Sequence, residues 1–237
     1  MALVAIRRAS DEAGAMRDTP RNRQTQSLVA SAQATIISNI SARPGETNRQ
    51  LKAEAEELFD SAIRLCSESD DPADEPVGLP ASRVYDSIGN HFSKWSEFEK
   101  DIAAHEKGLA ALANSPTDPP LVRRKKDMVR AQHLQGIGRA SLEKGDTTGA
   151  KKALSTARDI RLRLHADERG APLICADMAS TRLWLARLHV AEGRAAEALT
   201  EVEAGLAVLS PWEHSRIPAV SEFRERLAAL RDQLRTK

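Results

Sequence analysis

A pair of residues, one large and aliphatic and the next one small, recurs along this chain at an almost constant offset, and this recurrence limits the possible folds. The pair occurs at Ile88-Gly89, Ile137-Gly138 and Leu185-Ala186, and both intervals are about 48 residues long. Further along each segment, His105, Leu154 and Val202 keep the same register. Repetition at a fixed period is typical of solenoids, in which stacked helical hairpins share one core because no hairpin buries its apolar face alone.

The stretch 131–164 shows what one such unit contains. Apolar and small residues fall three and four positions apart in two runs, which predicts two amphipathic helices. Between the runs, Gly145 suits the left-handed position that ends a helix, and Asp146 can accept hydrogen bonds from the free amides that start the next one. Gly138 and Ala157 are small enough for two backbones to approach closely. The stretch is therefore expected to form an antiparallel helical hairpin.

The same reasoning predicts an all-α protein. Aromatic residues make up only 3% of the 237 residues, and no run alternates apolar and polar residues for long enough to indicate a strand. Residues 1–22 carry little periodicity and are expected to be a loose lead-in to a helical repeat domain over 23–237. That domain is expected to contain four hairpins and one closing helix, at about 24–67, 81–113, 119–165, 172–209 and 213–235.

Two local expectations concern the first half of the chain. The helix predicted from Gln24 is expected to carry its apolar face at Val29, Ala32, Ile36 and Ile40. Two helix starts are predicted from capping boxes, in which each of two side chains satisfies the other residue's backbone amide. These boxes pair Thr47 with Gln50 and Ser96 with Glu99.

A known repeat family has a similar pattern. The spacing of Leu134, Ile137-Gly138, Ser141, Gly145-Asp146, Ala150, Leu154 and Ala157 resembles the tetratricopeptide repeat. That repeat is usually 34 residues long, and the units of about 48 residues here are similar to the longer repeats that follow the membrane span of many bacterial serine/threonine kinases. The segment Pro44-Gly45-Glu46-Thr47, followed by Arg49 and Leu51, resembles the one that precedes such arrays, except that Arg49 follows the threonine by two residues instead of three.

This resemblance implies a right-handed superhelix that binds a protein or peptide partner in its concave groove, as a sensory or docking module of a kinase system. It also implies which residues line the groove, since the first helix of each unit faces it. These positions are Arg83, Asp86, Asn90, Gln132, Gln135, Arg139, Leu183 and Arg187. Asn and Arg side chains can hydrogen-bond a peptide backbone or hold a carboxylate through two parallel contacts. A partner with acidic groups is therefore expected, with ordinary solvated arginines as the alternative.

A net charge of +1 hides an uneven distribution of charge. Residues 68–75 hold five acids and no base, whereas residues 121–165 hold twelve Lys or Arg against four Asp or Glu. The basic patch Arg123, Arg124, Lys125 and Lys126 opposes the dipole of the helix that it starts, so helix stability does not explain it. Solvation or neutralisation by the acidic loop is one interpretation, and electrostatic nucleic-acid binding is the alternative function. The lack of interleaved aromatic residues argues against single-strand recognition.

No catalytic signature is present in the sequence. The six histidines show no His-x-x-x-His spacing and no companion cysteine. Gly136-Ile137-Gly138 lies inside a helix pattern and lacks the third glycine of a phosphate-binding loop. Neither a Gly-x-Ser-x-Gly elbow nor a kinase motif such as His-Arg-Asp or Asp-Phe-Gly occurs. We therefore expect a non-catalytic protein without a metal or a cofactor.

Cys66 and Cys175 lie on predicted apolar helix faces and are expected to be buried thiols, with a disulfide as the alternative. No apolar run approaches the length of a membrane span, which needs roughly 18 residues or more. A cytoplasmic protein is expected. If the chain is a fragment of a membrane-anchored kinase, the expected place is the extracytoplasmic side of a bacterial inner membrane.

Overall fold

The structure, a computed structural model, describes residues 2–16, 19–41, 46–68, 78–112, 118–167 and 171–236. Within these ranges every regular element is helical, which confirms the all-α prediction. The chain divides into two compact units, Met1–Val129 and Arg130–Lys237, and each has a hydrophobic core of its own. The described part of the chain contains no helix with the length and apolar character needed to cross a bilayer.

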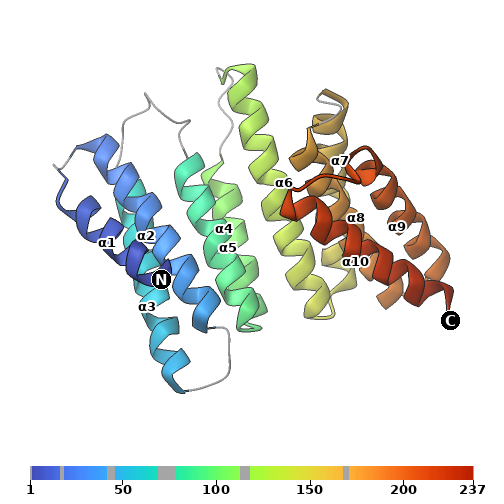
Figure 1. The fold of residues 1–237 in the computed structure, drawn as a ribbon, viewed down its shortest axis with the longest axis horizontal. Coiled ribbons are helices and arrows are strands. Elements are labelled where there is room, and N and C mark those ends of the chain that lie inside the picture. The colour runs from blue at the N-terminus through green and yellow to red at the C-terminus, as the bar shows by residue number, and fades with distance from the viewer. Residues whose placement is uncertain are drawn as a thin grey trace. The chain divides into compact units, whose positions relative to one another are not determined.

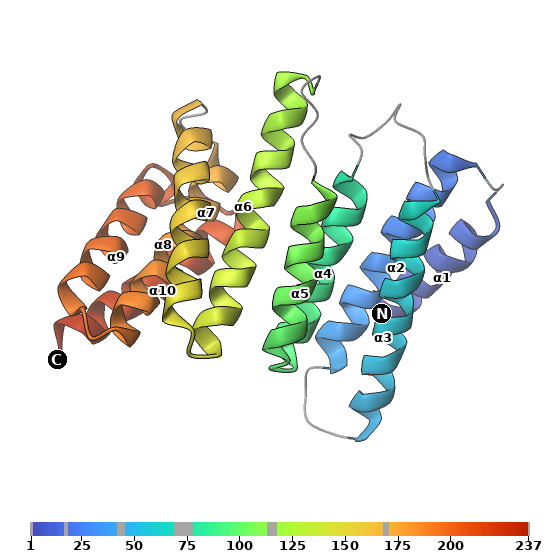
Figure 2. The same cartoon turned by 180° about the vertical axis from the view of Figure 1, so that it is seen from behind.

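The first unit consists of helices α1 to α5 and the start of α6. Their bounds are α1 Ala2–Gly14, α2 Pro20–Ser41, α3 Glu46–Ser67, α4 Leu79–Lys94, α5 Phe98–Ala111 and α6 Pro120–Glu143. Helices α2 and α3 pack on each other, as do α4 and α5, so the unit contains two hairpins. The first helices of these hairpins, α2 and α4, lie on the face seen in Figure 1, and the second helices, α3 and α5, lie on the face seen in Figure 2.

Helices α2, α3 and α4 share the core of the first unit. Ala34 and Ile37 from α2, Phe59 from α3 and Val84 from α4 are buried together. A polar contact joins the same three helices: His91 of α4 bonds Ser38 Oγ at 2.8 Å through Nδ1, and its Nε2 lies 3.6 Å from Glu56 Oε1. Burial lowers the pKa of His91, and Glu56 opposes that shift only in part.

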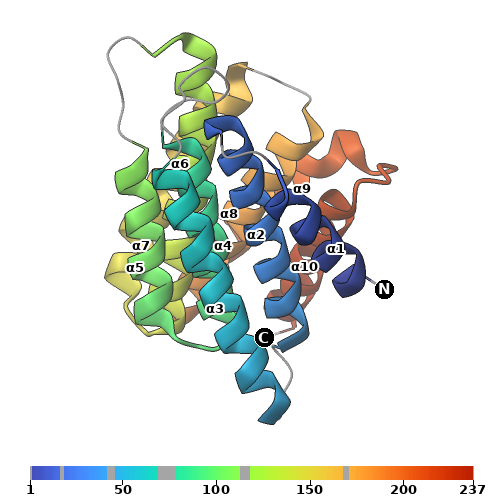
Figure 3. The ribbon, with the colours of Figure 1, turned by 90° about the vertical axis from the view of Figure 1, so that its left-hand side faces the viewer.

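The loose lead-in predicted for residues 1–22 is wrong, because residues 2–14 form α1 and α2 begins at Pro20. Figure 3 shows α1 lying against α2. Ala13 is buried in this contact, and the Gln26 side chain donates a hydrogen bond to the Ala13 carbonyl at 2.8 Å. Arg7 pairs with Glu54 of α3 at 2.9 Å. The apolar and polar residues of α1 are segregated along the helix, so the sequence contained a signal for this helix that the expectation of a loose lead-in missed.

The apolar face predicted for α2 is also wrong, and it lies on the opposite side of the helix from the core. The residues that α2 buries include Ala30, Ala34 and Ile37. Ala32 and Ile40, from the predicted face, are exposed instead. The buried face of α2 contains Ser27, Ser31 and Ser38, so its hydrophobic pattern is weaker than that of the outward stripe.

The second unit holds the rest of α6 and four further helices. Their bounds are α7 Thr147–Asp167, α8 Pro172–Ala191, α9 Ala195–Leu209 and α10 Pro218–Arg235, with a 3-10 turn at Ser210–Trp212. Helix α8 packs on α9, and α10 packs on both. Their shared core includes Leu183, Val202 and Leu227. The predicted hairpin 172–209 and the closing helix after it are therefore present.

A buried arginine connects three helices of the second unit. Arg161 of α7 donates hydrogen bonds to Gln135 Oε1 of α6, and to the Asp177 carbonyl and Thr181 Oγ1 of α8. Gln135 in turn donates to Ser180 Oγ at 3.0 Å. The guanidinium thus has acceptors on both neighbouring helices, as a buried charge requires.

The turn inside each hairpin recurs with the predicted offset. Residues Ser96, Gly145 and Gly193 all have positive φ, at 56°, 89° and 74°. In each turn the amide of this residue bonds the carbonyl three residues before it, and the next amide bonds the carbonyl five residues before it. The six bonds, all 2.8–3.1 Å long, are 96→93, 97→92, 145→142, 146→141, 193→190 and 194→189. This pattern ends a helix by satisfying its last carbonyls, and the turns keep the spacing of the Ile/Leu and Gly/Ala pairs.

The capping prediction is confirmed at one turn and wrong at another. Asp146 Oδ1 accepts a hydrogen bond from the Gly149 amide at 2.8 Å, as expected for an N-cap. Ser96 is not an N-cap, because it occupies the left-handed position that ends α4, and Glu97 is the N-cap of α5 with no side-chain hydrogen bond. The side chain of Thr47 lies outside the described residues, as do the Pro44-Gly45 segment and most of the acidic loop.

The repeated small residues lie where the two helices of a hairpin cross. A Cβ on Gly89 would fall 2.5 Å from the His105 ring, and a Cβ on Gly138 would fall 2.5 Å from Leu154 Cγ. Ala186, at the same register, is buried in the cluster that contains Val202. The close approach predicted at Gly138 is thus present, and Gly89 makes an equivalent one in the hairpin of α4 and α5.

Both cysteines are thiols. In the first unit, the half-buried Cys66 Sγ lies 2.9 Å from Ser27 Oγ. In the second unit, Cys175 is buried in the core of α8, α9 and α10. The expectation of a buried thiol is therefore confirmed for Cys175, whereas the Cys66 thiol is only half-buried, and the alternative of a disulfide is wrong.

Candidate partner-binding surface

The first unit has an open pocket between its two first helices, α2 and α4. Its volume is about 400 Å³. The lining residues are Leu28, Ser31, Ala32, Thr35, Ile36, Arg83, Val84 and Ser87. The misjudged apolar stripe of α2 supplies much of this lining, since Ala32 and Ile36 belong to it. Leu28 is 45% exposed beside the pocket, and Ile40, further along the same helix, is 43% exposed.

The chemistry of this pocket suits an aliphatic side chain. The Thr35 hydroxyl already donates a hydrogen bond to the Ser31 carbonyl at 2.8 Å, so a ligand in the pocket does not need to accept a hydrogen bond from it. Arg83 is the one charged side chain in the lining, and it is exposed. An arginine at the edge of an apolar pocket favours an acidic group next to the aliphatic one. Arg83 is thus a predicted groove residue that the structure brings into a pocket.

Three of the other predicted groove residues face inward. Leu183 is fully buried in the core of the second unit, so its assignment to a binding surface is wrong. Asp86 is 9% exposed, accepts a hydrogen bond from Asn90 at 3.1 Å and lies 3.7 Å from His105 Nδ1. Gln135 is half-buried, and its amide is engaged by Arg161 and Ser180. These three residues share one register position, one helical turn before the small residue at the helix crossing. Side chains at this position therefore point toward the second helix of the hairpin or toward the next helix.

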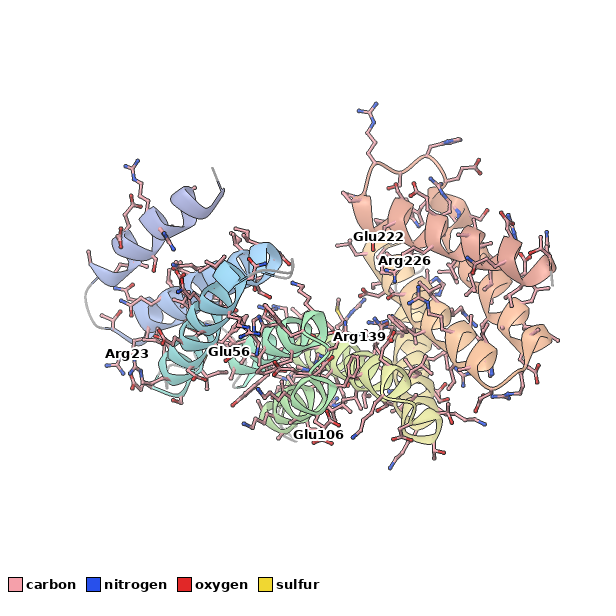
Figure 4. All side chains as sticks on the ribbon, turned by 90° about the horizontal axis from the view of Figure 1, so that it is seen from below. Arg23, Glu56, Glu106, Arg139, Glu222 and Arg226 are labelled. Atoms are coloured by element: carbon pink, nitrogen blue, oxygen red, sulfur yellow. The ribbon has the colours of Figure 1, made fainter. Side chains whose placement is uncertain are left out.

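The remaining predicted residues are accessible. Gln132 is exposed, and Asn90 and Arg139 are half-buried. Arg139 and Gln132 belong to the second unit, whereas Asn90 belongs to the first, so each is assigned to the surface of its own unit. Figure 4 labels Arg139 on α6.

Arg187 is the most distinctive of the predicted residues. Its guanidinium lies over the Trp184 ring, 4.6 Å from the ring centre. Within the part of the chain that the structure describes, no hydrogen bond or ion pair joins this guanidinium to another residue. Burial and repulsion from Arg226 lower the pKa of Arg187, and the charge of Glu143 opposes the shift. Two arginines near each other favour an anion at this surface.

Arg226 was not predicted from the sequence. It lies on α10, where its guanidinium sits 5.6 Å from the Phe223 ring centre and pairs with Glu222 at 3.0 Å (Figure 4). In the sequence, residue 226 lies within the closing helix expected at 213–235. Arg226 is half-buried in the structure. The pattern of charges in the sequence did not reveal this burial.

The predicted basic patch is smaller than the sequence suggested. Lys126 is 2% exposed and bonds Asp118 at 2.8 Å, so its inclusion in an exposed patch is wrong. Arg124 is half-buried, and only Arg123 and Lys125 are exposed. Two exposed charges on one helical turn give a weak electrostatic footprint compared with the several phosphate contacts of nucleic-acid-binding proteins.

Fold and surface together define an all-α protein of helical hairpins with an apolar pocket and arginines on its first helices. No family model matches the chain, and no curated protein shows a significant match. Among solved structures, it is similar to the crystal structure of BtubC (BKLC) from P. vanneervenii, with a TM-score of 0.67 and 15% sequence identity. The similarity covers 99% of this chain and 88% of that chain. At this identity the similarity supports the fold alone.

Proposed function

We propose that this chain is a non-catalytic binding scaffold of the tetratricopeptide type, which holds a segment of a partner protein on the face formed by its first helices. The proposal includes the right-handed superhelical stacking that such repeats adopt. From the resemblance of the sequence to kinase repeat regions, we also propose a docking role in a bacterial serine/threonine kinase system, in the cytoplasm or on the extracytoplasmic side of the inner membrane.

The observation that carries the proposal is the pocket between α2 and α4. Exposed aliphatic side chains usually lie singly on a surface, whereas here Leu28, Ala32 and the half-buried Ile36 follow one another along one face of a helix and border a cavity. Helix α2 already packs against the core of the first unit through a different face, so this stripe is not needed to hold the helix in place. The stripe is therefore explained by a partner that covers it.

The recurrence of turn geometry and of the close helix crossings supports the repeat part of the proposal. Three hairpins end their first helix with the same two hydrogen bonds, at equivalent places in successive repeats. Such regularity is expected of a repeat protein, in which each unit contacts mainly its neighbours.

Arg83 and Arg187 define the chemistry of the partner. Arg83 borders the apolar pocket of the first unit, and Arg187 presents a half-buried guanidinium on the second unit. Arginine binds carboxylates through two parallel hydrogen bonds, which adds direction as well as attraction. We therefore propose a partner segment that carries an aliphatic residue and acidic groups.

Selection from a displayed library of random ten-residue peptides tests this proposal. Enrichment of segments that combine an aliphatic residue with Asp or Glu is the expected result. Arg83→Glu should weaken, by about tenfold or more, the binding of enriched peptides that occupy the first unit, and Arg187→Glu should do the same for those that occupy the second unit. Charge reversal of Arg139 is expected to act in the same direction.

The matched control is Arg163→Glu, which reverses an exposed arginine on α7, a second helix of a hairpin. It changes the net charge by the same amount but leaves the proposed face intact. Equal losses in Arg163→Glu and Arg83→Glu would show that the peptide responds only to overall charge, and this would remove the proposed surface.

A further inference from the structure

The first unit contains a second cavity, away from the pocket between α2 and α4. It lies between α3, α4 and α5 and has a volume of about 470 Å³, which is within the usual range for small-molecule sites. Its apolar part comes from Phe59 of α3 and from Ile88 and Phe92 of α4. The face of the molecule that carries α3 and α5 is the one seen in Figure 2.

Charges of opposite sign line opposite sides of this cavity. Helix α3 contributes the carboxylates of Glu56 and Asp60, and α5 contributes the ammonium groups of Lys100 and Lys107. One charge on each side is already paired within the first unit. Glu56 pairs with Lys52 at 3.1 Å, and Lys100 pairs with Glu97 at 2.6 Å.

Asp60 and Lys107 are the two remaining charges, and both are exposed at the cavity. Among the residues that the structure describes, neither has a hydrogen-bond or ion-pair partner, and no ion pair joins one to the other across the cavity. The cavity therefore offers one negative group, one positive group and an aromatic and aliphatic floor between them.

We propose that this cavity binds a small zwitterion with an apolar body, either a free α-amino acid with a large apolar side chain or a short peptide. Asp60 receives the ammonium group, Lys107 receives the carboxylate, and the apolar body packs on Phe59, Ile88 and Phe92. A purely apolar ligand would use neither charge, and an ion of one sign would pair with only one of them. The inference does not depend on the proposed partner-binding face, since Asp60 and Lys107 lie on the second helices α3 and α5.

Calorimetric titration of the full chain with three related probes tests the charge requirement. The probes are L-phenylalanine, L-phenylalaninamide, which lacks the carboxylate, and 3-phenylpropionate, which lacks the ammonium group. Saturable binding of phenylalanine at concentrations up to about 10 mM is expected, with both single-charge analogues weaker by about tenfold or more. A dipeptide, phenylalanyl-phenylalanine, distinguishes the two ligand sources, since tighter binding than phenylalanine assigns the site to peptides and weaker binding assigns it to amino acids.

Two substitutions assign each charge to its residue. Asp60→Asn should weaken phenylalanine binding by about tenfold and abolish its preference over 3-phenylpropionate. Lys107→Gln should have the same effect on the preference over phenylalaninamide. Both residues are exposed, so neither change should unfold the protein. The matched control is Glu106→Gln, at an exposed residue of α5 (labelled in Figure 4) that does not line the cavity, and it should leave binding unchanged.

Three results would overturn the proposal. They are the absence of binding by both phenylalanine and the dipeptide, equal binding of the three probes, and wild-type affinities in both variants. None of these results bears on peptide capture by Arg83 and Arg187, so failure here is distinct from failure of the proposed function.

Discussion

A double substitution that transplants one repeat contact into another tests whether the hairpins are equivalent. In the hairpin of α6 and α7 the crossing is made by Gly138 and Leu154, and in the hairpin of α8 and α9 the same positions hold Ala186 and Val202. The register therefore predicts that Gly138→Ala and Leu154→Val each disturb the crossing alone and compensate each other together.

The magnitudes follow from the contact distances. A Cβ on Gly138 would lie 2.5 Å from Leu154 Cγ and 2.8 Å from its Cδ2, both too close for carbon atoms. Overpacking of this kind costs about 1–3 kcal/mol, against about 1 kcal/mol gained because alanine is the better helix former. Leu154→Val removes one buried methylene at a cost of about 1 kcal/mol. Valine has no δ carbon and so removes the 2.8 Å contact with Cδ2, which relieves part of the overlap, and the double variant should be destabilised by less than the two single effects together.

Hydrogen exchange of α6 and α7 amides measures the free energy of local opening in all four proteins of the cycle. A favourable coupling of about 1 kcal/mol or more is expected between the two substitutions. The control cycle combines Gly138→Ala with Leu209→Val, a buried residue in the core of α8, α9 and α10, and should be additive. Additive effects in the first cycle as well would refute the equivalence of the two crossings.

Three further predictions concern stability. Arg161→Met should lower the free energy of unfolding, measured by urea titration, by about 3 kcal/mol, because it leaves acceptors on α6 and α8 unpaired. The control Arg163→Met, on the exposed face of α7, should change it by less than about 0.5 kcal/mol. Ser96→Gly should raise the thermal midpoint, since it relieves a left-handed serine at the position of Gly145 and Gly193, and a lower midpoint would contradict that register. Because the pKa of His91 is lowered in the folded state, the unfolded state binds this proton first as the pH falls. The free energy of unfolding is therefore complete above pH 6.5 and decreases below it, by at most about 1.4 kcal/mol per pH unit. His91→Gln should flatten this part of the pH profile.

The parts of the fold that were predictable are those that depend on local chemistry. Gly145 and Asp146 were assigned correctly because a left-handed glycine and an N-cap aspartate each require a particular residue type. Ser96 was misassigned because serine is a common N-cap and rarely adopts positive φ. Ser96 occupies the same register as Gly145, one repeat earlier, and this register predicts a left-handed residue there. The usual preference of serine for the N-cap was given more weight than the register.

The candidate surface was harder to predict, since it depends on which face of a helix is covered. Apolar residues on α2 were assigned to the core, but this helix buries Ile37 together with alanines and serines and leaves Leu28 and Ile40 exposed. Leu183 was assigned to a groove by register alone, although its burial follows from its aliphatic side chain. Arg83 and Arg187 were assigned to the surface from their register and their charge, and their role there stays a prediction.

The affinity of a library-selected peptide for the variant Ala32→Trp tests the central claim most directly. Ala32 is exposed and lines the pocket between α2 and α4, so tryptophan would fill that pocket without entering the core. If partners bind at this face, the dissociation constant should rise by about 100-fold, equivalent to about 2.7 kcal/mol, with the circular dichroism spectrum unchanged. An unchanged dissociation constant would contradict the assignment of the first helices as the binding surface.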